Sequence, residues 1–123
     1  MDTADTNCPF CLKNKLLKGD VIHQTEKAYL IENSFHPGNF LIIPFAHITD
    51  IQQLPDNWWA DVKKLLALIP ELSSDFNISL NIGQLAGQTQ SHLHFWIIPR
   101  TAISVAPGKG LVGLLQLVQD YQV

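Results

Sequence analysis

The stretch Gly87-Gln-Thr-Gln-Ser-His-Leu-His-Phe-Trp-Ile-Ile-Pro-Arg100 places histidines at alternate positions of an apolar run. Alternate side chains of an extended strand point to the same face, so His92 and His94 are predicted to project to one side, with Trp96 next in line. The apolar residues between them then face a core. Two imidazoles on one strand face indicate either chemistry on a phosphate or a metal site.

The rest of the chain supplies the partners of this strand. Further strands are expected at 21–22, 28–31, 40–43 and 78–82, beside the histidine strand at 91–98. One long helix opens near 55–56, and its apolar stripe consists of Trp58, Val62, Leu65, Leu66 and Ile69. Short helices are expected at 12–18 and 111–121. This arrangement predicts an α+β fold with an antiparallel sheet and one long helix.

Length and charge limit the class of protein. The 123 residues are predicted to form a single domain, 1–123. A formal net charge of -3 gives no basic surface for a nucleic-acid backbone, and no apolar run has the length of a membrane span. Met1–Asn7 is acidic and polar, unlike a secretory signal. A cytoplasmic protein, with neither nucleic acid nor a membrane as its partner, is expected.

The two cysteines of the chain, Cys8 and Cys11, form a Cys-x-x-Cys pair. A cytoplasmic location argues against a structural disulfide and leaves redox chemistry, metal binding or coincidence. A thioredoxin-like pair follows a strand and opens a helix, and the sequence before Cys8 leaves no room for that strand. Metal binding and coincidence therefore stay open on these residues alone.

Four blocks of sequence together resemble the histidine triad (HIT) family of nucleotidyl hydrolases and transferases. They are Cys8–Cys11, Pro37–His47, Asn81–Gly83 and Gly87–Arg100. Their order and spacing agree with the family over nearly the whole chain, and the last block is the most specific. The resemblance implies a five-stranded antiparallel sheet with helices, usually paired into a homodimer, and a nucleotide as the small-molecule partner.

The resemblance assigns the role of nucleophile to His94. Imidazole is a good nucleophile at neutral pH, and its phosphoramidate adduct remains reactive. In-line attack on an α-phosphate would give a covalent nucleotidyl-His94 intermediate, which water or another acceptor then resolves. One ring nitrogen must be free to attack, so the other is expected to donate to a backbone carbonyl.

Polar residues around the histidines match the family's substrate contacts. Asn81 matches a contact to the nucleotide, and Gln88 and Thr89 match donors to the α-phosphate. Gly87 would let the backbone approach the substrate closely. Contacts to the base and ribose are expected near 29–34. Taken singly, these residues also fit a polar turn that leads into a strand.

In family members with the N-terminal cysteine pair, the resemblance implies a zinc site of two cysteines and two histidines. The matching positions are Cys8, Cys11, His47 and His92. Such a set closes a tetrahedral site, which indicates structural zinc that ties the segment 1–18 to the sheet, with no catalytic metal required. A catalytic zinc and an empty site with reduced thiols are the alternatives.

Three positions depart from the family pattern. Trp96 stands where the third histidine is expected, and indole donates a hydrogen bond but carries no proton to a leaving group. Asn39 stands where many members have histidine, and Phe45 where a lysine is frequent. Trp96 and Asn39 are both expected near the substrate. His36 either compensates for these changes or is an exposed loop histidine without a role.

Two functions follow from this resemblance. The first is a nucleotide-binding hydrolase or nucleotidyl transferase that acts on the α-phosphate of a nucleoside phosphate, phosphoramidate or dinucleoside polyphosphate. The alternative is a catalytically degenerate, zinc-stapled domain that binds a nucleotide or another protein. Trp96 separates the two, because it either permits turnover or fills the phosphate pocket.

Overall fold

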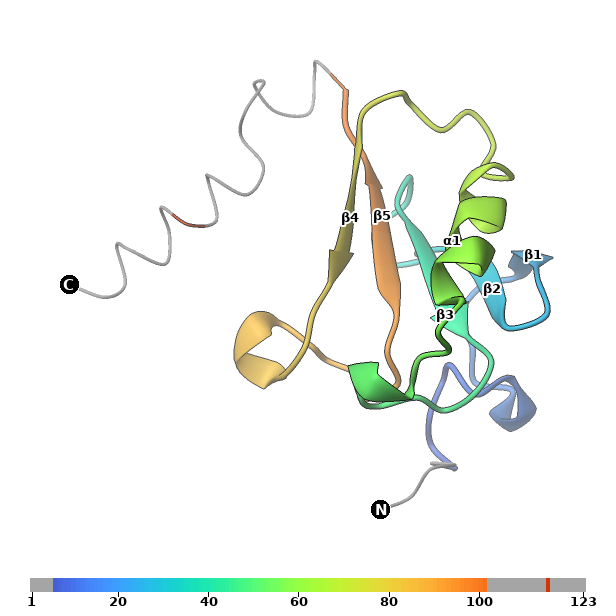
Figure 1. The fold of residues 1–123 in the computed structure, drawn as a ribbon, viewed down its shortest axis with the longest axis vertical. Helices are drawn as coiled ribbons and strands as arrows, with labels where there is room; N and C mark the ends of the chain where they lie inside the picture. The colour runs from blue at the N-terminus through green and yellow to red at the C-terminus, as the bar shows by residue number, and fades with distance from the viewer. Residues whose placement is uncertain (1–5, 102–114, 116–123) are drawn as a thin grey trace.

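Five strands form one antiparallel sheet in the order β1-β2-β3-β5-β4 (Figure 1). The computed structural model describes residues 6–101 and 115. The strands are β1 (Val21–Gln24), β2 (Ala28–Glu32), β3 (Phe40–Pro44), β4 (Phe76–Leu80) and β5 (Phe95–Pro99). The helix α1 (Trp58–Leu66) and three 3₁₀ turns, η1 (Leu12–Asn14), η2 (Ile51–Gln53) and η3 (Gln84–Ala86), complete the described elements. The predicted α+β fold with a five-stranded antiparallel sheet is confirmed.

The helix α1 lies against one face of the sheet (Figure 1). Its apolar stripe is buried in that contact. Trp58, Val62 and Leu65 pack there with residues of the inner strands, among them Ile42 and Ile97. Burial of these side chains is the main stabilising contribution, at about 1.5–3 kcal/mol for each fully buried large apolar residue. The position of the helix agrees with the sequence prediction, although its first turn begins only at Trp58.

The opposite face of the sheet is covered by the N-terminal segment. Tyr29, Ile31, Leu41 and Ile43 form a second apolar cluster there, and the side chains packed against it are Phe10, Leu12, Leu17, Val21, Phe45 and Trp96. The hydroxyl of Tyr29 donates a 2.6 Å hydrogen bond to the carbonyl of Phe10. Burial raises the pKa of Tyr29, which keeps the phenol protonated as that donor. The site described below lies on this face.

The strand β5 begins later than the sequence predicts. The prediction placed a strand over 91–98, whereas β5 starts at Phe95 and both histidines lie in the approach to it. The reason is a backbone contact outside the sheet, since the Leu93 N–H donates to the carbonyl of Ile48 at 2.8 Å. The alternation survives the correction, because Phe95 and Ile97 pack under the helix while Trp96 packs on the opposite face.

The predicted helix at 12–18 is wrong, because only the single turn η1 forms there. It ends at Lys15, which adopts a left-handed conformation with φ 56°. The Asn14 side chain donates to the carbonyl of Cys8 at 3.0 Å and folds the segment back on itself. The strand predicted at 78–82 is found two residues earlier, as β4. The helix predicted at 111–121 lies outside the described residues, apart from position 115.

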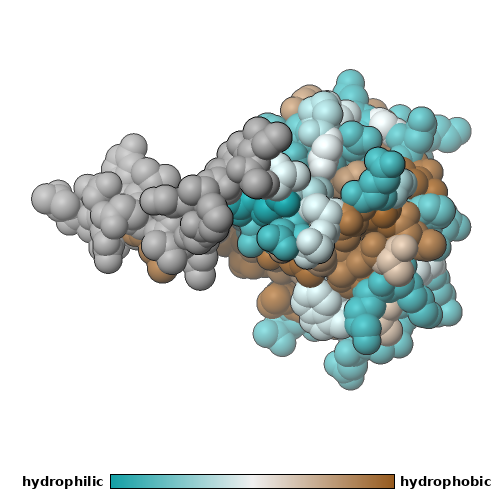
Figure 2. All heavy atoms as spheres, turned by 90° about the horizontal axis from the view of Figure 1, so that it is seen from above, coloured by the Kyte–Doolittle hydropathy of each residue, from teal (hydrophilic) through white to brown (hydrophobic). Residues whose placement is uncertain are grey.

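On the face seen in Figure 2, hydrophilic side chains surround an exposed apolar area. Within the described part of the chain, no helix has the length and apolar character needed to span a bilayer.

Candidate functional site

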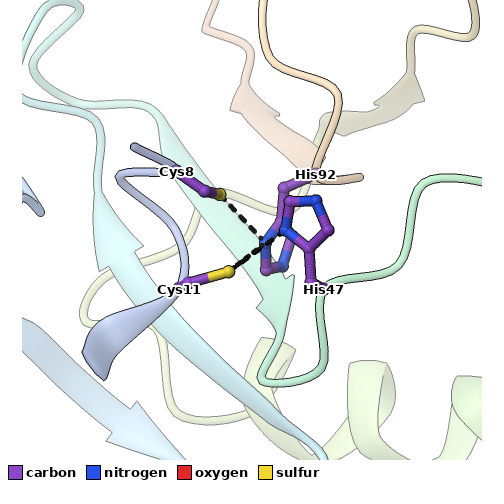
Figure 3. A group of neighbouring side chains, drawn as sticks. All are labelled: Cys8, Cys11, His47 and His92. Atoms are coloured by element: carbon purple, nitrogen blue, oxygen red, sulfur yellow. Dashed lines mark hydrogen bonds between the residues drawn. The ribbon is translucent and has the colours of Figure 1, made fainter. Parts of the chain in front are cut away.

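Two cysteines and two histidines from three separate segments form one cluster (Figure 3). Cys8 and Cys11 come from the N-terminal segment, His47 from the loop after β3, and His92 from the approach to β5. One ligand atom of each residue lies within 4.8 Å of the others, with Cys8 Sγ 3.3 Å from His92 Nδ1 and Cys11 Sγ 3.1 Å from His47 Nδ1. The structure thus brings together the four residues that the resemblance assigns to zinc.

His92 is oriented as metal-binding histidines are. Its Nε2 donates a 2.8 Å hydrogen bond to the carbonyl of Pro44, which leaves the lone pair on Nδ1 facing the thiols. A second ring nitrogen bound to a carbonyl is the usual support for a metal-ligating imidazole. Burial lowers the pKa of His92 to about 4, so the ring is neutral, as a ligand must be.

The donor set of the cluster fits zinc. The two cysteines do not form a disulfide and are buried, as is His92. Two thiolates with two imidazoles make a closed tetrahedral set, which is typical of structural zinc and leaves no position for a catalytic water.

His94 stands two residues along from the cluster and has a different environment. Its Nδ1 donates a 2.9 Å hydrogen bond to the carbonyl of His92, so the lone pair resides on Nε2. The ring packs against Phe10 with 4.9 Å between ring centroids, and the side chain is buried. Burial lowers the pKa of His94 and favours the neutral imidazole. The hydrogen bond to a backbone carbonyl is the one the sequence analysis expects of a nucleophile.

A cavity of about 460 Å³ opens beside His94. Its volume lies in the range of pockets that hold small organic ligands, about 300–1,000 Å³. Three parts of the chain line it, namely the N-terminal segment, the β2–β3 region and the loop before β5. The lining residues are Pro9, Phe10, Leu16, Leu17, Lys18, Ile31, Asn33, Ser34, Phe35, His36, Leu41, Gly87, Thr89, Gln90, His94 and Trp96.

Trp96 lines this cavity without filling it. Its ring centroid lies 6.4 Å from that of His94 and 5.8 Å from that of His36. The indole Nε1 is buried and has no hydrogen-bond partner among the described residues. His94 and His36 line the same cavity as Trp96.

Among the other predicted substrate residues, Gly87 and Thr89 also line the cavity. Gly87 has φ 98°, and a Cβ there would meet the Asn81 amide nitrogen at 3.3 Å, so both the turn and the close packing favour glycine. Ile31, Asn33 and Ser34, from the region expected near base and ribose, line the cavity as well.

Asn39, Asn81 and Gln88 are placed outside the cavity lining. The Asn39 amide donates to the carbonyl of His36, and the Asn81 amide to that of Gly87. The Gln88 amide holds its own loop: its oxygen accepts from the Gly83 N–H, and its nitrogen donates to two carbonyls at 90 and 91. These three side chains hold the loops that carry the cavity-lining residues.

Sequence reasoning missed most of the N-terminal contribution to the cavity. Phe10, Leu17 and Lys18 all line it, and Gln90 joins them from the opposite loop. The place of Phe10 could have been predicted, because it lies between Cys8 and Cys11. A metal bound by the two cysteines would also fix the position of Phe10. Leu17 and Lys18 carry no motif, because their place depends on how the segment folds back after η1.

Comparison with known proteins identifies the family of the chain. The HIT domain family model matches residues 15–103. An uncharacterized HIT-like protein of Methanocaldococcus jannaschii is 35% identical over 104 residues, which cover 76% of this chain and 78% of the relative. An adenosine 5'-monophosphoramidase of Candida albicans is 30% identical over 124 residues, covering 87% of this chain and 79% of that enzyme.

A solved structure shares the fold. The Zn-bound histidine triad family protein of Mycobacterium smegmatis superposes with a TM-score of 0.64 at 23% identity, over 93% of this chain and 97% of that protein. Family match, relatives and fold agree: this chain belongs to the HIT domain family.

Proposed function

We propose that this protein is a nucleotide hydrolase or nucleotidyl transferase that acts on an α-phosphate through His94. One observation carries the proposal: a buried, neutral imidazole with its Nδ1 bound to the His92 carbonyl borders a cavity of nucleotide size. The identity of a relative as an adenosine 5'-monophosphoramidase supports a nucleoside phosphoramidate as the substrate class. Nucleoside phosphates and dinucleoside polyphosphates carry the same α-phosphate and are the other proposed substrate classes.

In the proposed reaction, the lone pair on His94 Nε2 attacks the α-phosphorus. The new P–N bond forms as the bond to the leaving group breaks, which gives a nucleotidyl-His94 intermediate. Water or another acceptor then attacks phosphorus, and His94 departs as neutral imidazole. The Thr89 hydroxyl and the backbone at Gly87 supply donors for the phosphoryl oxygens, and the Lys18 ammonium supplies positive charge.

The apolar part of the cavity fits the nucleoside. Leu17, Ile31 and Leu41 line one part of it and offer contact area for a base. Asn33 and Ser34 lie on the same β2–β3 side and are the proposed contacts for ribose hydroxyls. In this arrangement Asn39, Asn81 and Gln88 support the loops without touching the nucleotide.

We propose a structural zinc in the cluster of Cys8, Cys11, His47 and His92. Four buried or half-buried donors with mutually compatible ligand atoms support it. The metal would tie the segment 1–18 to the sheet, and that segment carries part of the cavity wall. No step of the reaction passes through the metal. Reduced thiols in a metal site also favour a cytoplasmic location.

We propose that the protein forms a homodimer through β4 and the adjoining surface of α1. The strand β4 is an edge of the described sheet, with β5 on one side. A second cavity of about 470 Å³ borders it, lined mainly by apolar side chains such as Leu54, Trp59 and Ile78. Trp59 is 53% exposed and Ile78 40% exposed, and a large exposed apolar surface is typical of an interface.

The experiment that tests the proposed activity is hydrolysis of adenosine 5'-monophosphoramidate to AMP and ammonia, followed by chromatography. The wild-type protein is expected to turn the substrate over, and His94→Ala to lower kcat/KM by on the order of 10³-fold or more. The degenerate alternative predicts binding of AMP without turnover and no effect of His94→Ala on any residual rate.

A further inference from the structure

The cavity beside His94 holds few side chains that can move a proton. Among its lining residues in the described part of the chain, the ionisable ones are Lys18, His36 and His94. His94 is occupied as nucleophile in the proposed function. A lysine ammonium is a point charge suited to phosphate, whereas imidazole both gives and takes a proton near neutral pH. Among these three residues, His36 is therefore the one suited to transfer protons.

The backbone of His36 is fixed from both sides although its side chain is exposed. Its N–H lies 3.3 Å from the Asn33 side-chain oxygen and 3.2 Å from the Asn33 carbonyl. Its carbonyl accepts from both the backbone and the amide nitrogens of Asn39, each at 3.2 Å. Asn33 is itself buried and anchors the turn to the end of β2. The loop thus presents His36 to the cavity from a defined position.

Trp96 lies next to both imidazoles. Its ring centroid is 5.8 Å from that of His36 and 6.4 Å from that of His94. Indole has no second nitrogen that can accept a proton, so Trp96 cannot serve as an acid and base in turn. A ligand phosphate bound at His94 would therefore have an indole on one side and, beside the indole, a solvent-connected imidazole.

We propose that His36 is the general acid and base of this site, a role that rests on the proposed function. In the first step His94 Nε2 bonds to phosphorus, the bond to the leaving amine or alkoxide breaks, and His36 transfers its proton to that departing atom. In the second step His36 takes a proton from the attacking water, whose oxygen bonds to phosphorus while the P–N bond to His94 breaks. His36 ends the cycle protonated and His94 neutral, so protons and charges balance.

The test compares two adenosine 5'-phosphate derivatives that differ in their need for a proton. A 4-nitrophenyl ester releases a stable anion, whereas an alkyl phosphoramidate releases its amine only when nitrogen is protonated. His36→Gln is expected to lower kcat/KM for the phosphoramidate by about 10²–10⁴-fold, the usual contribution of general acid catalysis, and to leave the nitrophenyl ester within about 3-fold. His23→Gln is the matched control, since His23 is exposed on β1 and outside the cavity lining.

The outcomes are distinguishable. An equal loss on both substrates assigns His36 to binding or loop structure and overturns the proposal, as does an unchanged rate on the phosphoramidate. If Lys18→Met lowers kcat/KM for the phosphoramidate but not for the nitrophenyl ester, and His36→Gln changes neither, Lys18 is the general acid. That result also overturns the proposal for His36. If the wild-type protein hydrolyses neither compound, the proposed function itself fails. Turnover of the nitrophenyl ester by His36→Gln shows that the rest of the site is intact.

Discussion

The carbonyl of His92 accepts the Nδ1 hydrogen of His94 at 2.9 Å, while the His92 ring points its own Nδ1 at two thiols. One residue therefore fixes the tautomer of its neighbour through its backbone and contributes its side chain to a separate cluster. The orientation of His94 depends on the backbone at 92, and the cluster holds that backbone in place. The cluster of cysteines and histidines and the proposed nucleophile are in this way joined by two peptide bonds.

We predict one zinc per chain in the purified protein, measured by elemental analysis. Cys11→Ser is expected to lose the metal and to lower the melting temperature by about 10 °C or more, because the metal-binding energy contributes to folding. A chelator should lower the melting temperature of the wild type but not that of Cys11→Ser. The variant thus serves as the control for effects of the chelator that do not depend on the metal. Reversible loss of activity on chelation, with no change in melting temperature, would instead make the metal catalytic.

Gln88 and Thr89 are predicted to affect catalysis in different ways. Thr89→Val removes a hydroxyl at the cavity and is expected to lower kcat by about 10²–10³-fold, as loss of a phosphate donor does.

Gln88→Ala releases the loop that it ties to Gly83, and should speed hydrogen exchange at the Gly83 amide and lower kcat/KM by about 10–100-fold. Steady-state kinetics and exchange mass spectrometry check both. A kcat effect of Gln88→Ala without faster exchange would argue for direct contact with phosphate.

Asp61 is predicted to be the main polar contribution to stability on α1. It is buried, and its carboxylate accepts from the Thr25 hydroxyl at 2.6 Å and from the Lys27 N–H at 3.1 Å. Asp61→Ala removes the carboxylate that accepts both hydrogen bonds and is expected to lower the free energy of unfolding by about 2–3 kcal/mol in urea titrations. Glu26→Ala, an exposed change in the same turn, should stay within about 0.5 kcal/mol. Equal effects of the two variants would contradict this assignment.

The proposed dimer makes a prediction about mass in solution. Light scattering during gel filtration should give twice the 13.8 kDa of one chain. Ile78→Lys places a charge on the β4 surface beside Trp59 and is expected to yield monomer. Ile82→Lys is the control, because Ile82 is also exposed but lies beyond β4 and outside that cavity. A monomeric wild type, or dissociation by both variants, speaks against this interface.

The sequence predicted those parts of the fold that depend on local pattern. The strand β3 is an uninterrupted apolar run, β2 is one up to its last residue, Glu32, and the stripe on α1 has the helical period, so their places follow from the residues themselves. The start of β5 could not be found in this way, since it depends on a hydrogen bond between Leu93 and the distant Ile48. The turn η1 does not continue as the predicted helix because the chain changes direction at Lys15, whose left-handed conformation no local pattern records.

The candidate site was predictable where a motif carries it. The four residues of the cluster followed from the resemblance, and the structure brings them together. His94 borders a cavity, and its role as nucleophile stays a prediction. Gln88 shows the limit, because sequence assigns its amide to the phosphate while its partners lie within its own loop. The cavity wall from Phe10 to Lys18 depends on tertiary contacts that no local pattern records.

The most direct test of His94 as the nucleophile is to trap the covalent intermediate on it. The protein is mixed with the 4-nitrophenyl ester of AMP, quenched within milliseconds at alkaline pH, where phosphorylated histidine survives, and digested for mass spectrometry. We expect an adenylyl group on His94, absent from His94→Ala and present in His36→Gln. Turnover of the ester without an adduct, or an adduct on another residue, would contradict it.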